Sequence, residues 1–306
     1  MTQKNIYDNL SPLDYRYWDE EIASFFSESA FLKYKIKAEA ALVSALADLD
    51  ICSKDIANEV TKASEDISAA EVYEEEKITK HDIGALVNCI QRRVSDKAKP
   101  FVHFSATSCD IVNTANSARY KDATLAISIP RLKELERILI DITLREATTI
   151  QVGRTHGQHA VPITFGFAVT EYVSRLGESI LKLKELTREL VGKFSGAVGA
   201  YNTSTLFFNN PESFEKNILK NFDLNPAEHS TQITPPETLT RLLSEYVIVA
   251  GILANLSDDM RHLQRTEIGE VGEEFEKTQV GSSTMPQKRN PINFESAKSI
   301  WKVLMP

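Results

Sequence analysis

Residues 235–264 read PPETLTRLLSEYVIVAGILANLSDDMRHLQ, and this stretch decides the fold. Its two prolines form a rigid start for a helix. After them, apolar residues recur at steps that alternate between three and four without a break. This spacing is typical of a helix packed at a shallow angle against other helices. The apolar positions are Leu239, Leu242, Tyr246, Val249, Leu253, Leu256, Met260 and Leu263.

Two other stretches have helical periodicity over a similar length. They run from about residue 108 to 149 and from about 162 to 193. Pro130 interrupts the first of them and predicts a kink, because proline removes a backbone hydrogen bond and its ring displaces a carbonyl. Ordinary helices average about 11 to 12 residues, so three such long blocks favour a helical bundle over separate amphipathic helices. Shorter helical blocks precede them at about 19–50, 55–70 and 82–98.

The order of these blocks predicts an all-α protein in two parts. We expect a small N-terminal helical domain over residues 1–107, followed by an elongated helical bundle over residues 108–306. The sequence has no fixed-period repeat and no alternation typical of strands. The chemistry should therefore reside in the segments that interrupt the helices.

The composition indicates a reduced protein of the cell interior. The 306 residues include 35 lysines and arginines against 43 aspartates and glutamates, a formal net charge of −8. This acidic balance argues against a general nucleic-acid or membrane-surface binder. The three cysteines show no metal-ligand spacing, and we find neither a signal peptide nor an apolar run long enough to cross a membrane. We therefore expect a cytoplasmic location with no membrane partner.

The clearest interruption of the helices is residues 281–291, GSSTMPQKRNP. Glycine and proline at its ends predict a mobile loop with defined hinges. Its hydroxyls, lysine and amide supply a base, a cation and an anion-binding donor. A solvated linker can have a similar composition, so the segment alone leaves both interpretations open.

Residues 153–162, GRTHGQHAVP, form the second interruption. His156 and His159 have a spacing that zinc ligands can have, but no carboxylate or cysteine stands nearby to complete a tetrahedral set. We therefore expect no metal site. A histidine next to glycine at the junction of two long helices is better explained as an acid–base group.

The third interruption, residues 101–110, reads FVHFSATSCD and opens a long helix. Thr107, Ser108 and Asp110 are residue types that cap such a helix. Hydroxyls and free amides at a helix N-terminus also form an anion site. Taken alone, the segment favours the cap.

Together, the three segments resemble the signature regions of the fumarase/aspartase superfamily, in the same order and separated by long helices. The loop at 281–291 matches every fixed position of that superfamily's GSSxMPxKxNP pattern. Within the superfamily, the chain resembles the adenylosuccinate lyase family from about residue 10 to its end. The stretches that carry this similarity are SPLDYRY at 11–17, KHDI at 80–83, TSCDI at 107–111, RTHGQ at 154–158, KFSGAVG at 193–199 and STQ at 230–232.

The resemblance implies a C–N lyase of purine biosynthesis. Such an enzyme eliminates fumarate from adenylosuccinate, giving AMP, and from the succinyl-carboxamide ribotide. A proton leaves the carbon next to a carboxylate, so charge builds up there and needs hydrogen-bond donors and a cation. The leaving nitrogen needs a proton, which a histidine with an ordinary pKa of about 6.5 can supply. Elimination of this type requires no cofactor.

The resemblance also implies roles for individual residues. Ser283 would be the general base, activated by loop closure and by the charge of Lys288, and His156 would be the general acid. The succinyl carboxylates would be held by Lys288 and Asn290 with the helix start at 107–108. The expected substrate-binding residues are Arg16, Tyr17, His81, Asp82, Thr107, Ser108, Gln232, Lys288 and Asn290.

Two of these roles rest on the resemblance alone. Arg16 and Tyr17 would bind the nucleotide phosphate, and His81 would assist His156 or contact that phosphate. The residues by themselves favour a surface ion pair for Arg16 and an ordinary helix cap for His81.

One segment departs from the family's pattern. Many adenylosuccinate lyases follow the Thr-Gln element with an arginine-bearing segment resembling QRDRH, whereas residues 232–238 here read QITPPET. The nearest arginine, Arg241, lies in the following helix. Which residue completes the binding of the phosphate or carboxylate therefore stays open.

Two other functions stay open as alternatives. Argininosuccinate lyases also favour the Met-Pro-Gln-Lys run found at 285–288, although the segments at 80–82 and 154–157 disfavour that activity. A non-catalytic helical scaffold would use the same bundle only for assembly, although Ser283, His156 and Lys288 are all present.

The resemblance finally implies an assembly. The superfamily builds each site from three subunits of a tetramer, so we expect a homotetramer that acts on a small nucleotide and binds no nucleic acid. Family members usually continue beyond the signature loop into more bundle helices and a small C-terminal helical domain. We therefore expect this chain to be C-terminally truncated, and we do not assume that it is active in isolation.

Overall fold

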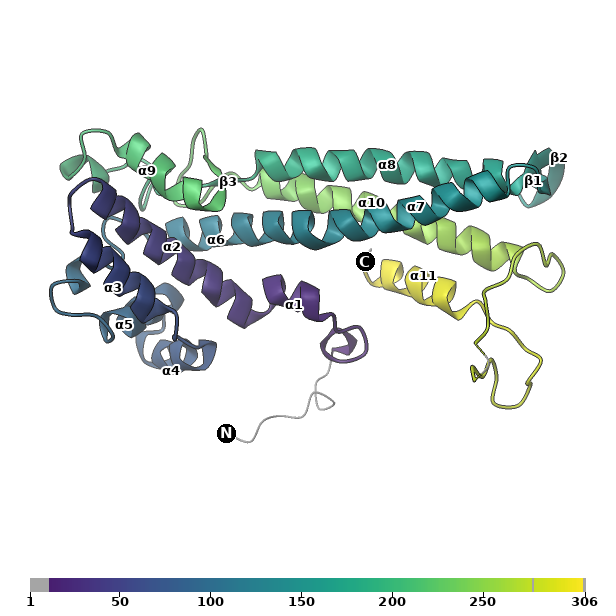
Figure 1. Cartoon of the computed structure of the whole chain (residues 1–306), viewed down its shortest axis with the longest axis horizontal. Helices are drawn as coiled ribbons and strands as arrows, with labels where there is room; N and C mark the ends of the chain where they lie inside the picture. The colour runs from purple at the N-terminus through teal and green to yellow at the C-terminus, as the bar shows by residue number, and fades with distance from the viewer. Residues whose placement is uncertain (1–10, 277, 305–306) are drawn as a thin grey trace. The chain divides into compact units, whose positions relative to one another are not determined.

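The computed structural model describes residues 11–276 and 278–304. These residues are mainly helical, which confirms the expected fold class (Figure 1). They form two compact units, one of Met1–Ser128 with Leu186–Thr240 and one of Ile129–Glu185 with Arg241–Pro306. Each unit joins two separate stretches of chain. The proposed domain boundary between residues 107 and 108 follows chain order and stays a prediction.

Short helices build the first unit around α2 (Glu28–Asp48). Its residues Leu42, Val43 and Leu46 are fully buried, and it packs against α3, α6 and α9. Serine starts three of the helices, because its side chain accepts a hydrogen bond from a free amide of the first turn. The helices are α1 (Glu20–Phe26), α2, α3 (Lys54–Ser64), α4 (Ala69–Thr79), α5 (Asp82–Gln91), α6 (Ser108–Ala123) and α9 (Pro211–Leu219).

Shorter elements complete this unit. Two parallel two-residue strands, β3 (Val191–Gly192) and β4 (Asn225–Pro226), join the segments after α8 and after α9. The remaining elements are the 3-10 turns η2 (Pro12–Asp14), η3 (Lys99–Phe101), η5 (Ser204–Leu206) and η6 (Lys220–Phe222), and the π-helical turn η4 (Thr124–Ser128).

Long helices build the second unit, which contains α7 (Ile129–Arg145), most of α8 (Phe165–Glu189), most of α10 (Glu237–Leu263) and α11 (Ile292–Leu304). Helices α8 and α10 lie side by side (Figure 1), joined by hydrogen bonds from Tyr172 to Asp259 and from Arg175 to Asn255. The predicted apolar seams are confirmed. None of the eight apolar positions named on α10 is exposed. The seven apolar positions with helical spacing in the block at 162–193 are all buried: Val169, Tyr172, Leu176, Ile180, Leu183, Leu186 and Leu190.

The expected irregularity at Pro130 is the π-helical turn η4, which directly precedes α7. Pro130 is the second residue of α7. A π-helical turn is wider than an α-helical turn, so it accommodates the proline ring and its missing donor.

Two expectations from the sequence are wrong. Residues 150–164, expected to lack strands, form an antiparallel hairpin of β1 (Ile150–Thr155) and β2 (Gln158–Thr164). In addition, α10 is long and apolar enough to cross a membrane by length and composition. A core helix of a water-soluble bundle meets the same two criteria, so this property does not identify a membrane protein.

Candidate active site

In the first unit, His81 connects two of the predicted segments. It caps α5: its Nδ1 accepts a hydrogen bond from the Gly84 amide, over 3.1 Å. A nitrogen that accepts cannot carry the proton, so the proton is assigned to Nε2. Nε2 lies 3.3 Å from Oγ of Ser108. The structure therefore confirms the helix cap and also brings His81 to the start of α6.

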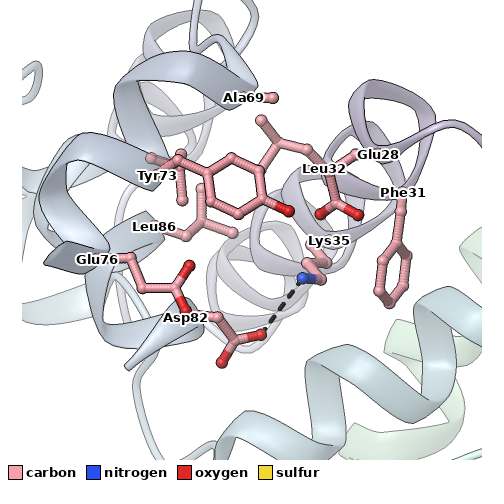
Figure 2. A pocket seen from close by; sticks show the side chains of 10 residues that line it. Glu28, Phe31, Leu32, Lys35, Ala69, Tyr73, Glu76, Asp82 and Leu86 are labelled. Atoms are coloured by element: carbon pink, nitrogen blue, oxygen red, sulfur yellow. Dashed lines mark hydrogen bonds and ion pairs between the residues drawn. The ribbon is translucent and has the colours of Figure 1, made fainter. Parts of the chain in front are cut away.

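The neighbouring Asp82 faces a different pocket (Figure 2). This pocket, of about 280 Å³, lies between α2, α4 and α5. The Asp82 carboxylate accepts a hydrogen bond from the buried ammonium of Lys35, at 3.3 Å. Glu28 and Glu76 line the same pocket, and the Lys35 ammonium also lies over the ring of Phe31. An acidic pocket of this kind suits no anionic group of a substrate.

Thr107 and Ser108 open α6 in a capping box. The Thr107 amide donates to Oδ2 of Asp110 over 2.8 Å. Asp110 is fully buried and paired with the equally buried ammonium of Lys193. Burial raises the pKa of Asp110, against the opposing effect of Lys193 and of the amide donors. The buried contacts of Asp110 therefore fix the position of the helix start that carries Thr107 and Ser108.

The remaining predicted residues of this unit are exposed. Gln232 lies in a short turn after Ser230. Arg16 and Tyr17 follow the turn η2, and their side chains point into solvent. Arg16 has no ion-pair partner within residues 11–276 and 278–304, so the expected surface ion pair is not formed there.

In the second unit, His156 stands at the tip of the hairpin. His156 and Gly157 form its two-residue loop, and both have positive φ values, 54° and 72°. This geometry is a type I′ turn, in which Asn-Gly is the favoured pair. A histidine in the left-handed region costs roughly 1 kcal/mol. Strained residues concentrate at functional sites, and the His156 ring is exposed with no hydrogen-bond partner among the described residues.

The first strand of the same hairpin is anchored by an ion pair, two residues before His156. The Arg154 guanidinium binds the Glu270 carboxylate, which also accepts a hydrogen bond from Gln151 over 3.0 Å. The pairing holds the pKa of Glu270 below its usual range. Arg154 is thus engaged within this chain, and it orients the strand that leads to His156.

The loop at 281–291 closes on itself. The Asn290 side-chain amide donates to the Gly281 carbonyl over 2.9 Å. A Cβ on Gly281 would lie 1.9 Å from the Lys288 carbonyl oxygen, so only glycine allows this approach. Ser282 accepts from the backbone amides of the next turn. Ser283 is exposed, and its hydroxyl has no partner in the part of the chain that the structure describes.

Two pockets flank the end of α10 in this unit. One, of about 590 Å³, is lined by the hairpin, including Gly157 and His159. The other, of about 1070 Å³, is lined by Lys288 and Asn290. His262 and Arg265 line both pockets, whereas Ser283 and His156 line neither. Within the described residues, no cluster of three histidine, cysteine or acidic side chains could hold a metal ion.

A protein family described as lyase matches residues 15–305. The chain belongs to this lyase family. The adenylosuccinate lyase of Pyrococcus abyssi is 38% identical over 296 residues, covering 96% of this chain and 65% of the relative. That of Archaeoglobus fulgidus is 36% identical over 294 residues, with the same coverage. Both findings confirm the expected resemblance.

The fold is also similar to that of a solved structure. The crystal structure of 3-carboxy-cis,cis-muconate lactonizing enzyme from Pseudomonas putida superposes with a TM-score of 0.83 and 27% identity. It covers 93% of this chain and 64% of that chain. The chain thus spans slightly less than two thirds of the length of the relatives it matches.

Sequence reasoning missed three residues around these segments. Glu270, His262 and Arg265 follow or end α10, and they meet the hairpin and the loop only through the fold. No local pattern marks them. Arg154 and Glu270 are 116 residues apart in the sequence, so no local motif could have predicted their pairing.

Proposed function

We propose that this lyase cleaves fumarate from adenylosuccinate, giving AMP, and from the succinyl-carboxamide ribotide of purine biosynthesis. The observation that carries the proposal is the 36–38% identity to adenylosuccinate lyases over 96% of the chain. It is joined by a signature loop and a histidine-bearing hairpin that present the residue types which this elimination requires.

The chemistry runs through two proton transfers. The Ser283 oxygen, as the alkoxide, removes a proton from the carbon adjacent to the one that bears the leaving nitrogen. The electron pair of that C–H bond forms the C=C bond of fumarate, and the C–N bond breaks. His156 gives its proton to the leaving nitrogen. General acid–base steps of this kind contribute about 10²- to 10⁴-fold each.

The geometry of the two segments supports these roles. The His156 ring is exposed at the hairpin tip and makes no hydrogen bond within residues 11–276 and 278–304, so both of its nitrogens are available there. The hydrogen bond between Asn290 and Gly281 closes the loop, so Ser283 and Lys288 lie within one closed loop. Lys288 and Asn290 would hold the succinyl carboxylates, together with the donors of Thr107 and Ser108 at the start of α6.

Other residues would bind the nucleotide. Arg16 and Tyr17 would hold the phosphate, and Gln232 would contact the substrate. His81 donates from Nε2 towards Ser108, so it would orient that hydroxyl or contact the phosphate. Asp82, facing its own pocket, would act through the position of His81. No cofactor takes part in this scheme.

We also propose that the native enzyme is a cytoplasmic homotetramer with sites shared among subunits. Large apolar side chains lie exposed on the long helices of the second unit, and stripes of this kind mark interaction surfaces. They include Ile138 and Leu144 on α7, Phe167 and Leu181 on α8, and Leu243, Val247 and Ile248 on α10.

The test is fumarate release, followed spectrophotometrically, with adenylosuccinate and argininosuccinate in parallel. We expect turnover of adenylosuccinate only, with a 10²- to 10⁴-fold lower kcat for Ser283→Ala. Thr284→Ala is the matched control, because it removes a hydroxyl from the same loop and should leave kcat unchanged. Cleavage of argininosuccinate alone would disprove the assignment. Normal activity of Ser283→Ala would show that Ser283 is not the general base.

A further inference from the structure

Two segments of the first unit that the proposed function assigns to the substrate meet on one helix. Thr107 and Ser108 form the start of α6, and the turn at 230–234 carries Gln232. The turn is far from α6 in sequence. Its place relative to the helix start must therefore be fixed by tertiary contacts.

One set of contacts holds the helix side of this arrangement. The Lys193 ammonium binds Asp110 and donates to the Gly196 carbonyl over 2.9 Å. The Lys193 amide also donates to the Thr114 hydroxyl over 3.2 Å. Both charged groups are fully buried. The segment that follows β3 is thereby fixed to the first two turns of α6.

A second set holds the near end of the turn. Ser195, in that same segment, exchanges a hydrogen bond of 2.8 Å with Ser230. Gly199 approaches Ser230 so closely that a Cβ would lie 2.2 Å from its carbonyl oxygen. The Thr231 amide donates to the Ile233 carbonyl over 3.1 Å, which closes a short turn around Gln232.

The far end of the turn is held by one side chain of α6. Oδ1 of Asn113 accepts hydrogen bonds from the Thr234 amide, at 2.8 Å, and from the Thr234 hydroxyl, at 3.0 Å. Asn113 is half-buried and lies six residues after Thr107 on the same helix. It therefore ties the last residue of the 230–234 turn directly to the helix that opens with Thr107 and Ser108.

We propose that Asn113 is a positioning residue, which locks the turn carrying Gln232 to the helix start carrying Thr107 and Ser108. Substrate groups held by two segments need a fixed spacing between those segments, because small misplacements lower rates or affinities strongly. The proposal rests on the proposed function for the substrate contacts, but the hydrogen bonds to Thr234 stand on the geometry alone.

The experiment compares Asn113→Ala, Asn113→Asp and Asn116→Ala. Asn113→Asp keeps the acceptor oxygen. Asn116→Ala is a matched control on the same helix, where the Asn116 side chain accepts a hydrogen bond from Arg119 and makes none to the 230–234 turn in the part of the chain that the structure describes. Hydrogen–deuterium exchange at the Thr234 amide should quicken at least tenfold in Asn113→Ala and stay near the wild-type rate in the other two. The KM for adenylosuccinate should rise about tenfold in Asn113→Ala with kcat changed less than threefold, the size of one lost hydrogen bond.

Each outcome decides a separate question. Unchanged exchange at the Thr234 amide in Asn113→Ala would show that Asn113 does not hold the turn. Faster exchange with an unchanged KM would show that Asn113 holds the turn but does not position it for the substrate, which would overturn the proposal. Failure of Asn113→Asp to keep the wild-type values would overturn it as well. If the wild-type enzyme released no fumarate from any succinyl substrate, the proposed function would fail, and the exchange rates would still decide whether Asn113 holds the turn.

Discussion

At the scale of single residues, His103 illustrates how a buried charge is compensated. Its Nδ1 lies 2.7 Å from Oε1 of the fully buried Glu39. The other oxygen of Glu39 has no hydrogen-bond partner among the described residues, so the ion pair is what compensates the carboxylate. Burial opposes the charged imidazole, but the Glu39 carboxylate, with a smaller effect of Asp110, raises the pKa of His103 above its ordinary value.

This pair predicts a pH dependence of stability. A raised pKa in the folded state means that the stabilisation is fully present below the unfolded value of about 6.5 and is lost as pH rises through the folded value. The free energy of unfolding of the wild type should therefore exceed that of His103→Gln most at low pH, and the difference should shrink above pH 6.5. Urea unfolding of both proteins from pH 6 to 9 measures it, and a difference independent of pH would contradict the ion pair.

At the scale of elements, the long helices were predictable and the hairpin was not. Helices α8 and α10 bury one stripe each, so their apolar residues recur with the helical period, and every expected position is at least half-buried. The strand β2 is exposed over most of its length and buries no face. Without a buried face there is no alternation to detect. The one local signal was the His156-Gly157 pair, which suits a two-residue turn.

The candidate site divides in the same way. The segments that carry Ser283, His156 and Thr107 are recognisable because their residue types and order resemble a known pattern. The contacts that support them are not recognisable, because Arg154 meets Glu270, and Asn113 meets Thr234, across more than a hundred residues. Sequence thus predicts which residue types react, and only the fold reveals which side chains hold their segments in place.

The buried pair between α6 and the segment after β3 should be strongly coupled. Removing one partner leaves an uncompensated buried charge, which costs about 3–5 kcal/mol. Lys193→Met should therefore destabilise the protein by that amount, whereas Lys193→Met combined with Asp110→Asn should cost clearly less than the sum of the two single changes. Urea unfolding of the four proteins in a double-mutant cycle measures the coupling. Additive effects would mean that the two charges do not interact.

At the scale of the whole molecule, the long helices raise the question of what covers their outer faces. Large apolar side chains are exposed on α7, α8 and α10, where polar side chains would interact better with water. Each fully buried aliphatic side chain of this size contributes about 1.5–3 kcal/mol. Burial between copies of the chain would recover this free energy, and it agrees with a site assembled from several subunits.

The native mass tests that arrangement. We expect an assembly of four times 34.3 kDa by native mass spectrometry and sedimentation. Leu144→Glu on α7 should dissociate it, because a carboxylate would be buried in an apolar contact without a partner, and fumarate release should fall with the tetramer. Ile78→Glu on α4, equally exposed but outside the long helices, is the control and should leave the assembly intact. A wild-type protein that sediments as a monomer at every concentration would rule out shared sites, and the reacting groups would then have to come from one chain.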